Sequence, residues 1–140
     1  MTKIIAIDPG LKTGIAIMQQ NVFLDIFTTD FWGCIEIIDN NKTAMFVLEK
    51  PNTNHVWHKK IGSANYSASI GLRVGSVIRE AQLIERHLLL RTANFVLTTP
   101  AGKSTATNFK NITGYEGRTN QHERDAGLMA WTYNKQIGVK

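Results

Sequence analysis

Cysteine, proline and long hydrophobic runs are scarce in this 140-residue sequence. Its one cysteine, Cys34, excludes an internal disulfide and a zinc site built from several cysteines. The chain has three prolines, and no hydrophobic run approaches the roughly 20 residues of a membrane-spanning helix. The N-terminus also lacks the pattern of a signal peptide. We therefore expect a soluble, cytoplasmic protein that does not associate with membranes.

Acidic residues are few in the middle of the chain. Between Lys50 and His122 there are ten Lys or Arg and three acids, a balance of +7, whereas the rest of the chain is −2. A concentrated positive charge favours a polyanionic partner, because Lys and Arg that face phosphates release counterions on binding. The length allows one full hydrophobic core, so we expect a single domain over residues 1–140.

The hydrophobic pattern predicts an α/β fold with a five-stranded mixed sheet flanked by helices. Three strands joined by short links are expected to form an antiparallel meander. A short helix after Asp30 would then return the chain so that the fourth strand lies parallel to the first. The residues 51–65 and 101–120 are expected to be loops. The predicted strands are Lys3–Ile7, Gly14–Met18, Val22–Thr28, Ala44–Leu48 and Phe95–Thr99, and the helices start near Phe31, Tyr66 and Thr119.

Acidic residues follow two of the predicted strands. Asp8 ends the first strand and Glu49 the fourth, and parallel neighbours place both at the same sheet edge. His122 and Asp125 are three residues apart on the last helix, so they share one face. Carboxylate oxygens with one imidazole suit Mg²⁺ or Mn²⁺. The pattern predicts a divalent metal site formed by these four residues.

Three segments resemble the motifs of the RuvC-type Holliday junction resolvases, which have a ribonuclease H-like fold. Residues 4–10, Ile-Ile-Ala-Ile-Asp-Pro-Gly, are similar to the first motif, and residues 47–51, Val-Leu-Glu-Lys-Pro, to the second. Residues 122–126, His-Glu-Arg-Asp-Ala, resemble the last. The glycine-rich residues 69–75 are similar to the start of the family's dimer-forming helix. The resemblance covers most of the chain in the correct order.

The resemblance implies a metal-dependent endonuclease that cleaves four-way or branched DNA junctions by phosphodiester hydrolysis. It implies a homodimer, about two Mg²⁺ or Mn²⁺ ions in each active site, and no small-molecule cofactor. Asp8, Glu49 and Asp125 would be the metal carboxylates, with His122 as the fourth ligand. Glu123 is turned about 100° away from the face of these residues, so we leave it out of the site.

DNA contacts are expected from basic residues and from two aromatic side chains. The family has basic positions near Lys110 and Arg118, and Trp57 and Tyr66 are candidates for stacking on unpaired bases. Each cation is also consistent with an ordinary solvated surface, and each aromatic residue with packing against the core. The full set of candidates is Lys50, Trp57, Lys59, Lys60, Arg73, Lys103, Lys110 and Arg118.

Two other functions stay open at this point. One is an RNA-processing nuclease of the same fold, and the other is a non-catalytic basic DNA-binding module. A nucleotide-binding protein of the actin type has a similar Asp-x-Gly turn, but it needs a far longer chain. The segment before the last helix departs from the family in the spacing of residues 113–118 and in its short length, which suggests a compact viral or divergent member.

Overall fold

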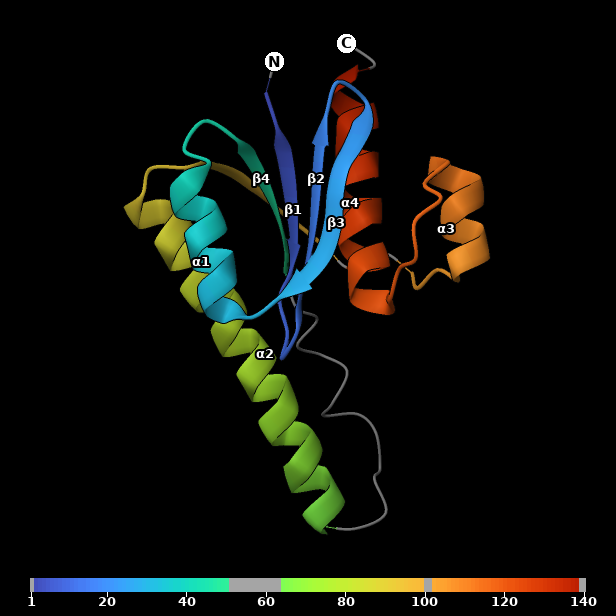
Figure 1. Cartoon of the computed structure of the whole chain (residues 1–140). Helices are drawn as coiled ribbons and strands as arrows, with labels where there is room; N and C mark the ends of the chain where they lie inside the picture. The colour runs from blue at the N-terminus through green and yellow to red at the C-terminus, as the bar shows by residue number, and fades with distance from the viewer. Residues whose placement is uncertain (1, 51–63, 100–101, 139–140) are drawn as a thin grey trace.

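A computed structural model describes residues 2–50, 64–99 and 102–138, with backbone only for 64–74. The chain order is β1-β2-β3-α1-β4-α2-β5-α3-α4 (Figure 1). The strands are β1 (Ile4–Asp8), β2 (Thr13–Gln19), β3 (Val22–Thr29), β4 (Met45–Glu49) and β5 (Asn94–Thr98), and the helices are α1 (Phe31–Asn40), α2 (Ala64–Leu90), α3 (Ala106–Thr113) and α4 (Gln121–Gly138).

The five strands form one mixed sheet in the order β3-β2-β1-β4-β5. The first three strands pair antiparallel, and β1, β4 and β5 run parallel to one another. The helical connections α1 and α2 make this parallel pairing possible, because a tight turn can join only antiparallel neighbours. The predicted α/β class, meander and parallel fourth strand are confirmed.

Helices cover both faces of the sheet, with α1 and α2 on one side and α4 on the other (Figure 1). Side chains alternate along β1: Ile4 and Ala6 belong to the core under α4, while Ile5 and Ile7 belong to the core under α1 and α2. Because both faces are covered, all five residues of β1 are buried, and Asp8 is among them. Burial on both faces makes β1 the rigid centre of the fold.

The prediction of a loop over residues 101–120 was wrong in its middle, where α3 forms. The Thr105 side chain accepts a hydrogen bond from the Asn108 backbone nitrogen at 3.1 Å, and Gly114 ends the helix at a φ of 75°. Phe109 is buried against Phe23 and the α4 helix. A polar helix with one buried anchor gives little hydrophobic periodicity, and the sequence pattern missed it for that reason.

The start of α2 also differs from the prediction. The predicted loop 51–65 lies mostly outside the described residues, but its last two residues belong to α2, which starts at Ala64 rather than Tyr66.

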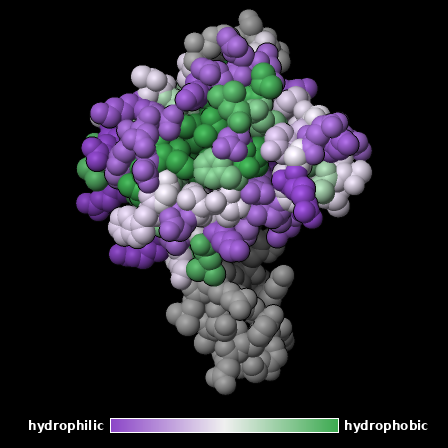
Figure 2. Space-filling view, in the orientation of Figure 1, coloured by the Kyte–Doolittle hydropathy of each residue, from purple (hydrophilic) through white to green (hydrophobic). Residues whose placement is uncertain are grey.

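Figure 2 shows hydrophobic residues at the surface over β2 and β3, where Val22 and Leu24 are 58% and 55% exposed. Among the described helices, none has the length and apolarity to cross a membrane.

The first turn of α4 lies directly against β2 at Gly14. A Cβ atom on Gly14 would overlap the carbonyl group of His122 and lie 3.2 Å from the Glu123 nitrogen. Gly14 is also the register partner of Asp8. The absence of a side chain on Gly14 therefore lets the helix that carries His122 approach the end of β1.

We predict that Gly14→Ala destabilises the protein by about 1–3 kcal/mol, because the methyl group must push backbone atoms apart. Gly102→Ala is the matched control, since a Cβ atom there meets no described atom within 4 Å. Urea unfolding of the two variants measures the difference. Equal stability of Gly14→Ala and the unmodified protein would contradict the close contact.

Candidate active site

Asp8 and Glu49 meet at the end of two parallel strands. Their strands pair in register through Ile7 and Leu48, so the next residue on each strand lies at the same sheet edge. The two carboxyl groups share a side-chain hydrogen bond. Asp8 is only 7% exposed and Glu49 is half-buried. The expected juxtaposition of the two acids is present in the structure.

The start of α4 brings His122 and Asp125 to the same edge. His122 Nδ1 lies 3.5 Å from Asp8 Oδ2, and the imidazole is half-exposed. The charge of Asp125 raises the pKa of both Asp8 and Glu49, so Asp125 lies close enough to interact with both carboxyl groups. The four residues that the sequence singled out for the site therefore come together from three elements, β1, β4 and α4.

A hydrogen-bonded cap fixes the start of α4. The Asn120 backbone nitrogen donates to Glu123 Oε1 and the Glu123 nitrogen to Asn120 Oδ1, both at 2.9 Å. Thr28 Oγ1 donates to the other Glu123 oxygen at 3.0 Å, which ties the cap to β3. The interpretation that Glu123 points away from the site is consistent with these contacts, because its carboxylate is used in the cap.

Burial dominates the electrostatics of the two central acids. The pKa of Glu49 is raised from 4.5 to about 9, and burial is the largest cause, followed by the hydrogen bond and the charge of Asp8. Burial also raises the pKa of Asp8, whereas the hydrogen bond with Glu49 opposes the increase. The hydrogen bond raises the pKa of Glu49 and opposes the increase at Asp8, so Glu49 is the donor and Asp8 the acceptor.

Lys103 and Gln121 complete the surroundings of the carboxylates. The positive charge of Lys103 opposes the increase in the pKa of Asp8, so this predicted DNA contact also acts on the centre of the site. Gln121 Nε2 donates to Asp125 Oδ1 at 2.7 Å. Sequence reasoning missed Gln121, although its spacing of four residues from Asp125 on one helix face was a usable signal.

The donor set fits a hard divalent cation in its chemistry. Asp8 and Glu49 place two carboxyl groups side by side, and Asp125 adds a third one close enough for its charge to act on both. Among the described residues, no three His, Cys, Asp or Glu side chains stand in a ready-made coordination geometry. The metal site predicted from the sequence therefore has suitable ligands at one edge, and metal binding itself stays a prediction.

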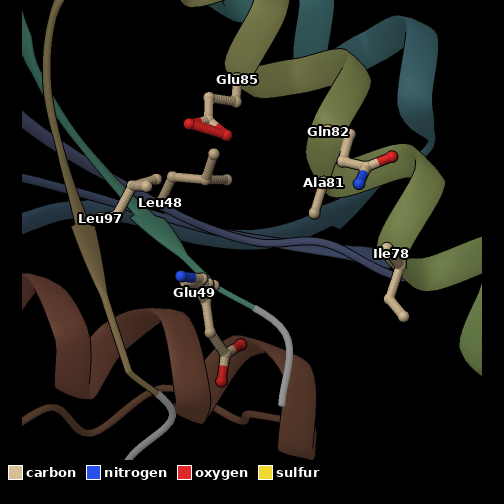
Figure 3. A pocket seen from close by; sticks show the side chains of 8 residues that line it. Leu48, Glu49, Ile78, Ala81, Gln82, Glu85 and Leu97 are labelled. Carbon is tan, nitrogen blue, oxygen red and sulfur yellow. The ribbon is translucent and has the colours of Figure 1, made fainter. Parts of the chain in front are cut away.

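A cavity of about 200 Å³ lies beside Glu49, between α2 and the strands β4 and β5 (Figure 3). Its walls include Leu48, Leu97 and Ala81, and Glu85 extends toward the strands from α2. The Glu49 carboxylate points out of this cavity toward α4. The cavity and the acidic site thus lie on opposite faces of the sheet.

The predicted DNA contacts divide into three groups. Lys50, Lys103, Lys110 and Arg118 are exposed, and Lys110 Nζ lies 3.8 Å from Glu116 Oε1. Arg73 belongs to α2, but its side chain is outside the described part. Trp57, Lys59 and Lys60 lie outside the described residues altogether.

Comparisons with known proteins support the fold through structure alone. The Thermus thermophilus RuvC in complex with a Holliday junction substrate matches with a TM-score of 0.62 and 14% identity, over 99% of this chain and 96% of that chain. Another Thermus thermophilus RuvC structure matches with a TM-score of 0.57 and 12% identity, over 98% and 97%. No family model and no curated protein matches the sequence. The chain has the ribonuclease H-like fold of RuvC, as its motifs predicted.

We predict that Glu49→Gln makes the metal-free protein more stable at alkaline pH. The pKa of Glu49 is higher in the folded than in the unfolded state, so its stabilising effect is lost as the pH rises from about 4.5 to about 9. Glutamine stays neutral, and we expect an advantage of about 2 kcal/mol near pH 9, allowing for partial exposure, and little below pH 5.

Urea unfolding in EDTA from pH 5 to pH 9 measures this difference. A difference between Glu49→Gln and the unmodified protein that does not change with pH would show that Glu49 is charged in the folded state.

Proposed function

We propose that the protein is a metal-dependent, structure-selective endodeoxyribonuclease that resolves four-way or branched DNA junctions. The observation that carries the proposal is the convergence of Asp8, Glu49, His122 and Asp125 at one sheet edge of a RuvC-like fold. Three oxygen ligands and one imidazole, beside exposed cations, are the donor set of a phosphodiester hydrolase. Neither the fold nor the basic surface alone would indicate hydrolysis.

The proposed metal ligands are Asp8, Glu49, Asp125 and His122, for two Mg²⁺ or Mn²⁺ ions. Bound there, such ions would supply an activated water and neutralise charge on the phosphoryl group. Asp8 is suited to a central role, since its strand lies in the middle of the sheet and it contacts both Glu49 and His122. Glu49 must release its shared proton before it can act as a ligand.

Two groups besides the carboxylates would take part in the reaction. The imidazole of His122 is half-exposed and accessible to solvent, so it would either complete the metal ligands or move a proton between water and the scissile phosphate region. Lys103 provides a positive charge near Asp8, which would offset the repulsion between the acidic site and a DNA phosphate. The site thereby combines carboxylates with a cation that admits an anionic substrate.

The substrate class follows from the fold neighbour and from the charge. The Thermus thermophilus RuvC is described with a Holliday junction substrate, and we propose the same class for this chain. A four-way junction has strands related by two-fold symmetry, so we also propose a homodimer that uses α2. Lys50, Lys103 and Arg118 would contact phosphates close to the scissile bond.

We predict that Asp8→Asn abolishes junction cleavage, with a loss of at least about 100-fold in rate, while junction binding is kept or strengthened. The substitution removes a ligand and one negative charge near the phosphates. The measurement is single-turnover cleavage of labelled four-way junction, duplex, Y-fork and RNA duplex with Mg²⁺ or Mn²⁺. A preference for the RNA duplex would favour an RNA-processing nuclease, and wild-type cleavage by Asp8→Asn would exclude the assigned site.

We predict that Arg118→Ala flattens the salt dependence of junction binding by about one unit in the slope of log K against log salt. Arg118 is exposed, and no described residue forms an ion pair with it. Lys110→Ala should have a smaller effect, since Glu116 partly neutralises that side chain.

The control is Lys135→Ala, in the last turn of α4, where the ammonium lies over the Trp131 ring. Fluorescence anisotropy in EDTA at several salt concentrations gives the slopes. Identical slopes for Arg118→Ala and Lys135→Ala would remove Arg118 from the DNA surface.

A further inference from the structure

Gln121 bridges the Asp125 carboxylate and the Arg124 guanidinium. Its Nε2 donates to Asp125 Oδ1 at 2.7 Å, and its Oε1 accepts from an Arg124 terminal nitrogen at 3.3 Å. A guanidinium can only donate and a carboxylate can only accept, so these two partners allow one orientation of the amide. Gln121 therefore presents its donor to Asp125 in a defined direction.

Arg124 is itself held by backbone carbonyl groups. Its guanidinium donates to the Thr119 oxygen at 2.7 Å and to the Ser104 oxygen at 2.9 Å, and the side chain is partly buried. Thr119 precedes α4, and Ser104 belongs to the segment between β5 and α3. The same arginine thus connects two separate segments and the Gln121 amide, which leaves it poorly placed to contact a phosphate.

We propose that Gln121 is a positioning residue that holds the Asp125 carboxylate in its ligating orientation, with Arg124 as its support. This inference rests on the proposed function, because it assigns a role to a neighbour of a proposed metal ligand. It adds a residue that the motif pattern does not contain. Hydrogen bonds from such neighbours orient metal ligands and restrict their side-chain rotation.

The neutral amide is important for this role. A direct contact between Arg124 and Asp125 would place a full positive charge on the carboxylate and compete with a cation. Gln121 instead donates an uncharged hydrogen bond to Asp125, and its side chain separates the Arg124 guanidinium from the carboxylate. Asp125 keeps its negative charge for a metal ion while its orientation is fixed.

The test measures Mn²⁺ binding by calorimetry, with Mn²⁺ alone and no DNA. Gln121→Met keeps the length of the side chain and removes the donor, and we expect Mn²⁺ affinity to fall by about 10–100-fold. Gln121→Asn, which withdraws the amide by one methylene group, should show the same direction. Gln136→Met is the matched control on the same helix, where the side chain is exposed, and it should bind Mn²⁺ as the unmodified protein does.

Two further readouts separate positioning from a general structural effect. Thermal unfolding and junction binding in EDTA should be unchanged in a folded Gln121 variant. In the Asp125→Asn background, adding Gln121→Met should cause no additional loss of Mn²⁺ affinity, because the group that it positions is already altered. Unchanged affinity in Gln121→Met, or a loss that adds fully to that of Asp125→Asn, would overturn the proposal.

The two proposals fail in different ways. If Asp125→Asn binds Mn²⁺ normally, Asp125 is not a ligand, and both the metal assignment and the role of Gln121 are wrong. If Asp125→Asn loses affinity while Gln121→Met does not, the metal assignment stands and only the positioning role is overturned.

Discussion

The close contact between Gly14 and the first turn of α4 is the constraint on which the candidate site depends. It lets the His122 backbone pack directly against β2 at Gly14, which pairs with Asp8 at the end of β1. A larger residue at position 14 would force the helix away. The Asn120–Glu123 cap and its bond to Thr28 then fix the rotation of the helix. His122 and Asp125 share one helix face, so fixing this single turn places both side chains toward Asp8.

The cost of this arrangement lies in the buried acids. Asp8 ends the fully buried strand β1 and Glu49 is half-buried at the end of β4, and their raised pKa values reflect the free-energy cost of removing a charged carboxylate from water. The hydrophobic packing of β1 on both faces offsets it, since neither strand can separate from its neighbours without exposing the core. Acidic groups buried at some cost in stability, and supported by a well-packed strand, are typical of functional sites.

The sequence predicted the parts of the site that depend on regular geometry. A helical crossover implied parallel strands, which put Asp8 and Glu49 at one edge, and spacing on a helix paired His122 with Asp125. It missed α3, because one buried phenylalanine among polar residues leaves no periodic signal. It also missed the hydrogen bond from Arg124 to the Ser104 carbonyl oxygen, because a contact between residues 20 positions apart produces no local sequence pattern.

For the proposed DNA binding, the position of each cation matters more than the total charge. Arg91 Nε lies 3.0 Å from Asp39 Oδ1, and Lys110 lies near Glu116. Nearby acids therefore neutralise part of the excess positive charge of the sequence. Lys50 directly follows Glu49 at the end of β4, and the charge of Lys103 acts on Asp8, so both exposed cations belong to the edge that carries the acids. The net charge of +5 is therefore less informative than the position of these two residues. Their charge would offset the repulsion between the carboxylates and a phosphate, which is the electrostatic condition for an acidic site to accept a polyanion.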